Sequence, residues 1–493
     1  MGAIIQQTAI GAESMPVNTN HPDYTEYEPI WRRVTVVAKG TYWVKKEQTR
    51  LLPAEFAAEF PERYARYLER AYVQGVTGRT RDSLVGMVFR RAPRVNIPEQ
   101  MMPWLENIDG AGQSLEQVAK AMMKSLLETG RYALLVDAPM MPPGASSEEE
   151  RAMDLRPTLA AYPAKSLINW RFEGVKGKQK LTMVVLQEFI DAPADEFGHD
   201  KQTVYRVLRL RDGVYTQQLY NIDGSEKTEE WVPRMARREG QREGQPLDFI
   251  PLQIIGSENN LPDVDMPPLY NLAEIEIAQY RNIADLEEAG FVIAQPMLHV
   301  DLGETDVNTW NEQNPHGISL GSRFGITTKG GNAQIMQAQS DNLSMALVDS
   351  KNGQMAQMGA SLVQRGGGTE TAEAARINAS AEASVLETVV GNASEGIEAS
   401  LETMARFAGI DPDVIEYRLN NQFWETGLDP QALTAVMAAR QGNALATRDV
   451  IHMIKTGRIE LEDGREPEQI MEDIANEFFD EPTGSAGATL DGQ

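Results

Sequence analysis

The stretch LYNLAEIEIAQYRNIADLEEA, residues 269–289, directly follows the helix-breaking pair Pro267-Pro268. Its apolar residues recur at the 3.6-residue spacing of a helix, which predicts an amphipathic helix over Leu269–Ala289. The apolar stripe contains Leu272, Ile275, Ile283 and Leu286. Acidic residues occupy much of the remaining surface, namely Glu274, Glu276, Asp285, Glu287 and Glu288. The pattern predicts one packing face and one acidic face.

Four further elements follow this helix. Residues 291–338 read as a small α/β or β insertion, and Ser340–Met358 reads as a second helix. A glycine-rich loop then precedes a very long helix over Thr371–Ala408, which would be about 55 Å long at 1.5 Å per residue. Because one compact core does not need a helix of this length, we expect something other than one compact core to set it.

The long helix and the loop before it have distinctive compositions. Its first half is rich in alanine, which allows close helix packing, and its second half has an ordinary apolar stripe. Gly391 and Gly396 lie where a bend costs least, so we expect a kink there. The loop contains Gln364, Arg365 and three glycines, Gly366, Gly367 and Gly368, which favour movement or close approach to another surface.

The part upstream of residue 269 mixes helices with strands. A helix is predicted over Ser114–Thr129, with Ser114 as its cap, and Asp212-Gly213 has the composition of a hairpin turn. The predicted strands are Tyr132–Val136, Thr158–Tyr162, Lys180–Ile190, Val204–Leu210, Val214–Tyr220 and Phe249–Ile255. The fold class is therefore α+β, followed after Gly409 by short helices predicted at Pro412–Asn421, Pro430–Arg440, Thr447–Thr456 and Pro467–Phe479.

Composition excludes several classes of protein. With 493 residues, 42% of them hydrophobic, the chain is globular and long enough for two to four domains. It has no apolar run of transmembrane length and no signal peptide, so we expect a protein made and used in a cytoplasm, without a membrane partner. No cysteine is present, and the five histidines are scattered, so the sequence predicts no disulfide, thiolate or metal site.

Charge and motifs give no positive case for an enzyme. The net charge of −26 argues against an ordinary nucleic-acid-binding surface, although acidity that only aids solubility is the simpler interpretation. Neither Gly110-Ala-Gly112 nor Gly366-Gly367-Gly368 has the context of a nucleotide-binding loop. No nucleophile or zinc motif occurs, so no catalytic residue, cofactor or metal is predicted. A hydrolase that uses a pair of acidic residues remains an alternative, although no motif supports it.

Several motifs in the first part of the chain together resemble the portal proteins of tailed bacteriophages, in a group often labelled only as a domain of unknown function. They are His21-Pro-Asp-Tyr24 with Trp31, Thr77-Gly-Arg-Thr80, Leu84–Pro93, Ile108–Gly112 through Tyr132, Leu135–Pro139 and Ile168-Asn-Trp170-Arg. The similarity runs from about His21 to beyond Leu286, whereas Val36–Leu52 matches weakly. None of these motifs carries catalytic chemistry.

The resemblance implies a dodecameric ring at one capsid vertex, with a β-rich wing, a helical stem, a small α/β clip, a long kinked helix and a helical crown. The expected segments are an N-terminal arm (1–20), the wing (21–268), stem helix 1 (269–290), the clip (291–338), stem helix 2 (339–358), a tunnel loop (359–371), the long wing helix (372–408), the crown (409–480) and a disordered tail (481–493).

The same resemblance implies functions for particular segments. Double-stranded DNA would pass through the ring without sequence specificity during packaging and ejection. The tunnel loop, with Gln364, Arg365 and Gly366–Gly368, would contact it, and Glu274, Glu276, Glu287 and Glu288 would line an acidic wall. The clip residues Asp301, Trp310, Arg323 and Lys329 would bind partners.

The expected partners and locations follow from that role. Terminase and head-completion or adaptor proteins would dock on the ring, and the major capsid and scaffolding proteins would surround it. The protein would reside at the portal vertex of the virion, and in the host cytoplasm during assembly. The alternative is a structural virion adaptor or scaffold without a DNA channel.

Overall fold

A computed structural model describes residues 15–137, 156–175, 178–192, 195–235, 244–294, 297–303, 306–313, 315, 333–336, 343–361, 385–421, 423, 430–442, 445, 448–450, 453 and 469. The chain divides into two compact units, one that ends at Asn421 and one that begins at Gln422. Each unit is described by itself. The mixture of helices and antiparallel sheets confirms the α+β class.

A three-stranded antiparallel sheet lies at the centre of the first unit. Its middle strand is β2 (Arg131–Asp137), which pairs with β3 (Thr158–Pro163) and β8 (Leu252–Gly256). The six residues of β2 before Asp137 are all buried, as the apolar sequence predicts. Helix α5 (Leu115–Thr129) packs on β2 and begins at Ser114 with a complete capping box.

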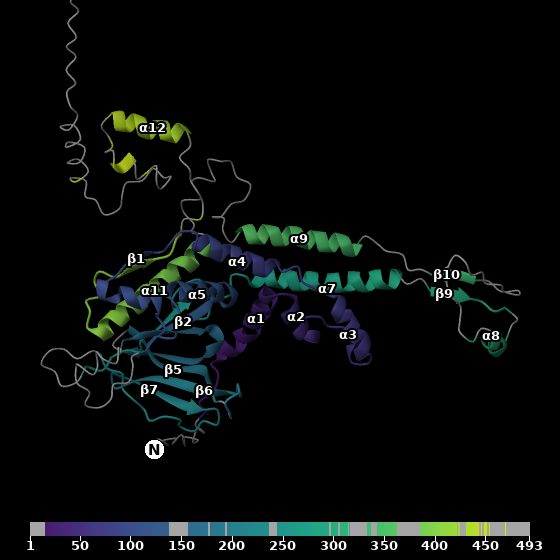
Figure 1. Ribbon diagram of the computed structural model, residues 1–493, viewed down its shortest axis with the longest axis horizontal. Helices are drawn as coiled ribbons and strands as arrows, with labels where there is room; N and C mark the ends of the chain where they lie inside the picture. Colours follow the sequence, from purple (N-terminus) through teal and green to yellow (C-terminus); the bar gives the residue numbers. More distant parts are fainter. Residues whose placement is uncertain are drawn as a thin grey trace, which may run out of the picture. The chain divides into compact units, whose positions relative to one another are not determined.

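A second sheet contains four strands in the order β4 (Leu167–Val175), β5 (Lys178–Asp191), β6 (Lys201–Arg211) and β7 (Val214–Asn221), all antiparallel (Figure 1). The turn between β6 and β7 has positive φ at both Asp212 (51°) and Gly213 (76°), which is the geometry that a two-residue hairpin requires. The predicted hairpin is therefore confirmed. Strand β4 was not among the predicted strands.

Helices from the N-terminal part of the chain pack against α5 and against the helix that begins at Tyr270. Four α-helices begin here: α1 (Pro22–Lys39), α2 (Thr41–Lys46), α3 (Pro61–Arg70) and α4 (Val76–Val88). Trp31 and Tyr24 of α1 are buried, and their rings pack edge to face. Short 3-10 helices lie at Gln48–Arg50, Glu55–Ala57, Glu99–Glu106 and Ala164–Ser166.

The helix predicted over Leu269–Ala289 is present as α7 (Tyr270–Ile293), which ends four residues later than expected. The chain continues through β9 (Met297–Val300), α8 (Val307–Gln313) and β10 (Ala333–Met336) into α9 (Leu343–Ser361). Strands β9 and β10 pair antiparallel, so the predicted small α/β insertion is present. Helix α9 runs to Ser361, past the predicted end of the second stem helix and into the expected tunnel loop.

The long helix is described as α11 (Val385–Ala408), which is continuous through both Gly391 and Gly396. The first part of the predicted helix, 371–384, lies outside the described residues. The helix predicted at Pro412–Asn421 is wrong, because that segment holds β11 (Glu416–Arg418), which pairs with β1 (Arg94–Asn96). This pairing joins the chain after α11 to the first unit, although the crown was expected to begin at residue 409.

In the second unit, α12 (Pro430–Gln441) confirms the helix predicted at Pro430–Arg440. Val436, Val450 and Met453 form a small apolar cluster with Leu445 beside them. The other segments predicted as crown helices lie largely outside the described residues, as do the first fourteen residues and the tail from 481.

Candidate functional site: the α7–α9 helix pair

Helix α7 is the candidate site because it connects the body of the first unit to the β9–α8–β10 insertion (Figure 1). Pro267-Pro268 ends the preceding loop, and the backbone N–H of Leu269 donates to the carbonyl of Leu127 in α5. Leu272, Ile277, Tyr280 and Ile283 of α7 are buried. Its first two-thirds therefore form part of the core. Of the predicted stripe, Leu272 and Ile283 are buried, whereas Ile275 and Leu286 are only partly buried.

The acids of α7 were expected to form a channel wall, but Glu276 has a different role. Its side chain is 0% exposed, and its two carboxylate oxygens accept hydrogen bonds from the backbone N–H groups of Val76 (2.9 Å) and Thr77 (2.8 Å). These are the first N–H groups of α4, which have no partner within the helix. Glu276 is therefore a buried cap on another helix and cannot line a channel, which corrects that prediction.

Glu274 and Glu288 pair with arginines from the N-terminal helices. Arg33 of α1 donates to both oxygens of Glu274, at 2.6 Å each, in a bidentate contact that is about two-thirds shielded from solvent. Arg70 of α3 pairs with Glu288, and Arg63 approaches the same carboxylate at 4.0 Å. These arginines neutralise two of the predicted wall charges in each copy.

One more contact from α3 fastens the middle of α7. The hydroxyl of Tyr67 donates to Asp285 at 2.6 Å, and burial together with this carboxylate raises the pKa of Tyr67 well above its usual range. Glu287 is half-buried and has no hydrogen bond or ion pair with any described residue. Of the four predicted wall acids, Glu287 is thus the one whose charge stays uncompensated within the described part of the chain.

Helix α9 runs back along α7. The side-chain amide of Gln279 on α7, itself fully buried, donates to Asn352 (2.7 Å) and to the carbonyl of Val348 (3.4 Å) on α9. Met355 of α9 is buried in the same seam. A buried amide that bonds to one register of the partner helix fixes that register.

Toward the insertion, the two helices expose apolar side chains. Five large apolar residues there are between 42% and 62% exposed: Phe291, Val292, Leu343, Met345 and Leu347. The guanidinium of Arg70 lies 4.3 Å from the centre of the Phe291 ring, so this surface begins where α3 ends its contact with α7. An apolar surface of this kind on a helix pair is typical of an interaction site.

The insertion itself is small and ordered by local carboxylates. Asp301 accepts from the backbone N–H of Gly303 at 2.9 Å, and Asp306 caps α8 by accepting from the N–H groups of Asn308 and Thr309. Trp310 lies on α8 and is half-buried. The other two predicted clip residues, Arg323 and Lys329, lie outside the described residues, and so do Gln364, Arg365, Gly366, Gly367 and Gly368.

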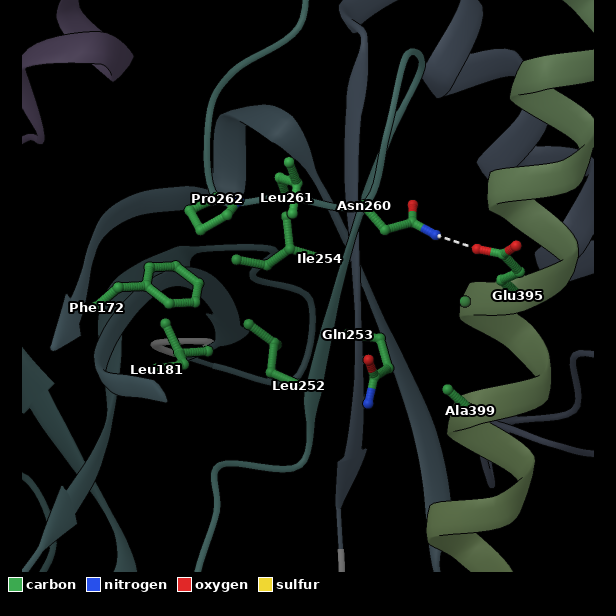
Figure 2. A pocket seen from close by; sticks show the side chains of 11 residues that line it. Phe172, Leu181, Leu252, Gln253, Ile254, Asn260, Leu261, Pro262, Glu395 and Ala399 are labelled. Carbon is green, nitrogen blue, oxygen red and sulfur yellow. Dashed lines mark hydrogen bonds between the residues drawn. The ribbon is translucent and has the colours of Figure 1, made fainter. Parts of the chain in front are cut away.

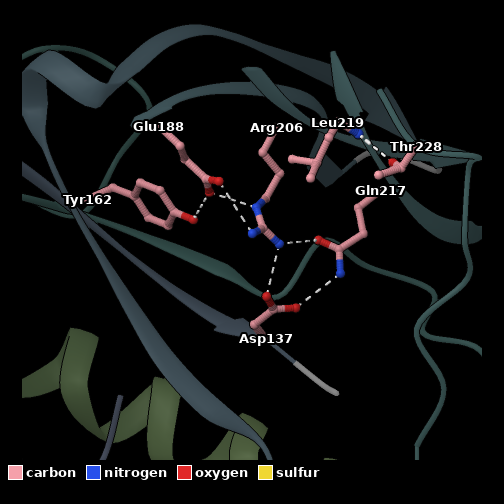
Figure 3. Close-up of polar contacts among 7 residues, drawn as sticks. All are labelled: Asp137, Tyr162, Glu188, Arg206, Gln217, Leu219 and Thr228. Carbon is pink, nitrogen blue, oxygen red and sulfur yellow. Dashed lines mark hydrogen bonds and ion pairs between the residues drawn. The ribbon is translucent and has the colours of Figure 1, made fainter. Parts of the chain in front are cut away.

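A second polar cluster, which sequence reasoning missed, joins the two sheets (Figure 3). Arg206 of β6 donates to Glu188 of β5 at 2.7 Å and to Asp137 at the end of β2 at 2.9 Å. Tyr162 of β3 donates to Glu188 at 2.5 Å, and Gln217 of β7 donates to Asp137 at 3.0 Å. The five residues are far apart in the sequence, so no spacing could have revealed them.

This cluster is satisfied internally. Burial and the neighbouring Glu188 raise the pKa of Tyr162 well above its usual range, so the hydroxyl stays protonated and remains a donor. Both carboxylates share the Arg206 guanidinium, and its pKa is raised above its usual value by Tyr162, Glu188 and Asp137 against the effect of burial. An acid pair held in this way has no free acid or base to offer a substrate, so the arrangement is that of a structural joint.

A groove of about 320 Å³ lies between β8 and α11 (Figure 2). Its walls are mainly apolar, and the side-chain amide of Asn260 bonds to Glu395 at 3.3 Å across one end. Gly396 of α11 lies at the wall, where a Cβ atom would collide with Ile255 of β8. Glycine is therefore required for close packing here. The groove contains no cluster of catalytic groups.

Among the described residues, no group of three or more histidine, aspartate or glutamate side chains could hold a metal ion. Across the same part of the chain, no helix is both long and apolar enough to cross a membrane.

Comparison with known proteins adds one family and several structures. A family described as "Domain of unknown function (DUF4055)" matches residues 268–408, the segment that contains α7, the insertion, α9 and α11. No curated protein matches the chain.

Several solved structures are similar to this chain at low sequence identity. The neck of an empty GTA particle, computed with C6 symmetry, is 14% identical with a TM-score of 0.40, over 77% of this chain and 89% of that one. The neck of a native GTA particle, computed with C12 symmetry, is 14% identical with a TM-score of 0.38, over 78% and 89%. An HK97-family phage portal protein from Corynebacterium diphtheriae is 11% identical with a TM-score of 0.30, over 72% and 94%.

Proposed function

We propose that this chain is a portal subunit, which assembles into a ring at one vertex of a tailed-bacteriophage capsid. The observation that carries the proposal is the helix pair α7–α9, anchored to the body by arginine–carboxylate contacts and carrying a small α/β element at its other end. This is the stem, clip and stem order that the sequence motifs imply. The family match covers the same segment.

Within the proposed ring, each segment has a task. The two sheets and the N-terminal helices form the wing, and the β9–α8–β10 insertion is the clip that engages terminase and head-completion or adaptor proteins. The major capsid and scaffolding proteins contact the outside of the ring. The exposed apolar end of the α7–α9 pair supports assembly, because a monomer would leave it open to water.

The ring would act as the conduit for DNA in packaging and ejection. Glycines at 366–368 would let the loop approach a moving duplex closely, and Arg365 would supply one weak phosphate contact per copy. Of the predicted wall acids, Glu287 supplies an uncompensated charge, whereas Glu276 is excluded by its burial. The protein would reside at the portal vertex of the virion, and in the host cytoplasm before the capsid is complete.

Mass and symmetry of the purified protein test this proposal. Native mass measurement and particle imaging should show a closed ring, expected to contain twelve copies, with an open axial hole. A compact oligomer without a hole would instead favour the structural adaptor. A protein that stays monomeric at capsid-assembly concentrations would refute both.

The clip assignment has its own test. Replacing Val300–Lys329 by a short glycine–serine linker should leave soluble rings, because the described contacts of α7 with the body all lie outside this range. Such rings should fail to engage terminase and head-completion proteins. Normal DNA packaging and tail joining by the deletion variant would show that the clip is not the docking element.

The loop assignment is tested by replacing Gly366–Gly368 with alanines. Rings should assemble normally, whereas packaging should slow or packaged DNA should slip, because alanine restricts the backbone. An Arg365→Ala variant separates the role of the cation from that of the backbone. Unchanged packaging and DNA retention in both variants would remove the loop from the mechanism.

A further inference from the structure

The hairpin formed by β5 and β6 projects past its neighbours in the sheet. Strand β4 pairs with β5 only as far as Leu186, and β7 pairs with β6 only from Val204 onward. Residues 189–191 and 201–203 therefore pair only with each other, as a two-stranded ribbon. Beyond the ribbon, Asp195 accepts from the backbone N–H of Phe197 at 2.9 Å, so the described part of the tip has a defined conformation.

The chemistry of this ribbon is unusual for a surface hairpin. Phe189 is 63% exposed and Phe197 is 82% exposed, the largest exposure of any large apolar residue among the described residues. Four acids surround them, all exposed: Asp191, Asp195, Glu196 and Asp200. A projecting strand pair with two open phenylalanines and an acidic rim has the composition of an interface element.

A surface of opposite charge lies on α2 and the end of α1. Tyr42 is 64% exposed and Trp43 is 42% exposed, and their rings pack edge to face with centres 5.5 Å apart. The ammonium group of Lys46 lies 4.6 Å from the centre of the Tyr42 ring, and those of Lys39 and Lys46 lie 5.0 and 4.8 Å from that of Trp43. We call these four residues the lysine–aromatic patch.

The lysines of the patch form no ion pair with any described carboxylate. By contrast, Arg32 and Arg50 both pair with Glu47. Likewise, no hydrogen bond, ion pair or ring contact joins the patch to the β5–β6 ribbon within the described part of one copy. Each surface lacks the kind of partner that the other offers.

We propose that the acidic β5–β6 ribbon of one copy docks on the lysine–aromatic patch of the next copy in the ring. Phe197 would pack on the exposed Tyr42 and Trp43 rings, and the acids beside it would pair with Lys39 and Lys46. This proposal rests on the proposed ring and names one of its subunit contacts. In a chain with a net charge of −26, local charge complementarity also offsets part of the repulsion between copies.

Such a contact is of the kind that can close into a ring. The two surfaces belong to different elements, so the contact is heterologous: each copy offers a ribbon to one neighbour and a patch to the other. An open chain of copies leaves one ribbon and one patch unused at its ends. In a closed ring, this last ribbon docks on this last patch, so neither stays exposed.

The experiment uses paired charge reversals in the full chain. The variants are Lys39→Glu/Lys46→Glu, which makes the patch acidic, and Asp195→Lys/Glu196→Lys, which makes the ribbon basic. All four side chains are exposed, so both variants should fold as the wild type does, which far-ultraviolet circular dichroism checks. The matched control, Lys180→Glu/Arg211→Glu, changes the net charge by the same amount as the first variant, at one partly exposed and one exposed site away from both surfaces. Each of these two residues forms one surface ion pair, with Asp248 and Glu230 respectively.

Native mass measurement at physiological salt then reads out assembly. Each charge-reversed variant alone should assemble at least tenfold more weakly than the wild type, whereas the control should form rings normally. A mixture of the two variants should recover rings in which they alternate, because each ribbon again meets a patch of opposite charge. The chain that carries all four substitutions should recover rings by itself. Phe197→Ala should weaken assembly without any change in charge.

The outcomes separate the two proposals. Normal rings from either charge-reversed variant alone, or no recovery in the mixture, would overturn the ribbon–patch contact while the portal ring stands. If the recovered rings contain an odd number of copies, alternation fails and the contact is overturned as well. A wild type that forms no ring would instead refute the proposed function on which this contact rests.

Discussion

Replacing Glu276 tests whether an acid of α7 serves the fold or a channel. Its carboxylate accepts two hydrogen bonds from the first N–H groups of α4, at 2.9 and 2.8 Å, and the side chain is 0% exposed. Hydrogen bonds to a charged group contribute roughly 1.5–3 kcal/mol each, so Glu276→Ala should destabilise the first unit by about 3–5 kcal/mol. Glu276→Gln keeps one acceptor oxygen and should cost about half as much.

Guanidinium unfolding followed by far-ultraviolet circular dichroism measures this loss. The matched control is Glu287→Gln on the same helix, which should change stability by no more than about 0.5 kcal/mol because Glu287 has no bond to the described residues. A loss of stability that is largest for Glu276→Ala, smaller for Glu276→Gln and smallest for the control identifies Glu276 as a buried cap. If Glu276→Ala unfolds at the wild-type midpoint while DNA transport changes, the cap assignment is wrong and a channel role returns.

Three further predictions use the same unfolding measurement. Gly396→Ala should destabilise the first unit by about 1–3 kcal/mol, because the added methyl group collides with Ile255. Gly391→Ala on the same helix has open space around it and should stabilise the unit by up to about 1 kcal/mol, so equal effects of the two variants would refute the packing argument. Arg206→Met should cost about 3–5 kcal/mol because it leaves two carboxylates without their shared cation, and a neutral result would show that the joint is dispensable. Burial lowers the pKa of His21 below its ordinary 6.5, so protonation favours the unfolded chain and stability should fall as the pH drops below that value. The His21→Asn variant keeps a capping side chain and should lose this pH dependence, and an unchanged pH profile in the variant would contradict the prediction.

Local patterns in the sequence predicted much of the fold. The breaker Pro267-Pro268 and the 3.6-residue stripe located α7, and Ser114 with its capping box located α5. Asp212-Gly213 located a hairpin because the turn needs positive φ at both residues. In each case the information lies within a few residues of the element that it specifies.

The wrong predictions concern residues whose partners lie far away in the sequence. Strand β11 was predicted as a helix because its partner β1 lies more than three hundred residues earlier, and strand pairing overrides the weak local preference. Glu276 was assigned to a wall because its acceptor role depends on α4, two hundred residues earlier. Charge and periodicity say where an acid lies on its own helix, but not which distant N–H group or arginine meets it.

The contacts of α7 change what its acidity can do in the proposed channel. Arg33 compensates Glu274, Arg70 and Arg63 compensate Glu288, and Glu276 is buried. The described helix therefore offers a passing duplex the charges of Glu287 and of Asp285, whose partner Tyr67 is neutral. At a Debye length of about 8 Å in physiological salt, only charges close to the wall act on the DNA. Two acids per copy without a cationic partner, repeated around a ring, give a weak and even repulsion. Such a wall would neither bind the duplex nor hold it at one position, which suits a conduit through which DNA must move in both directions.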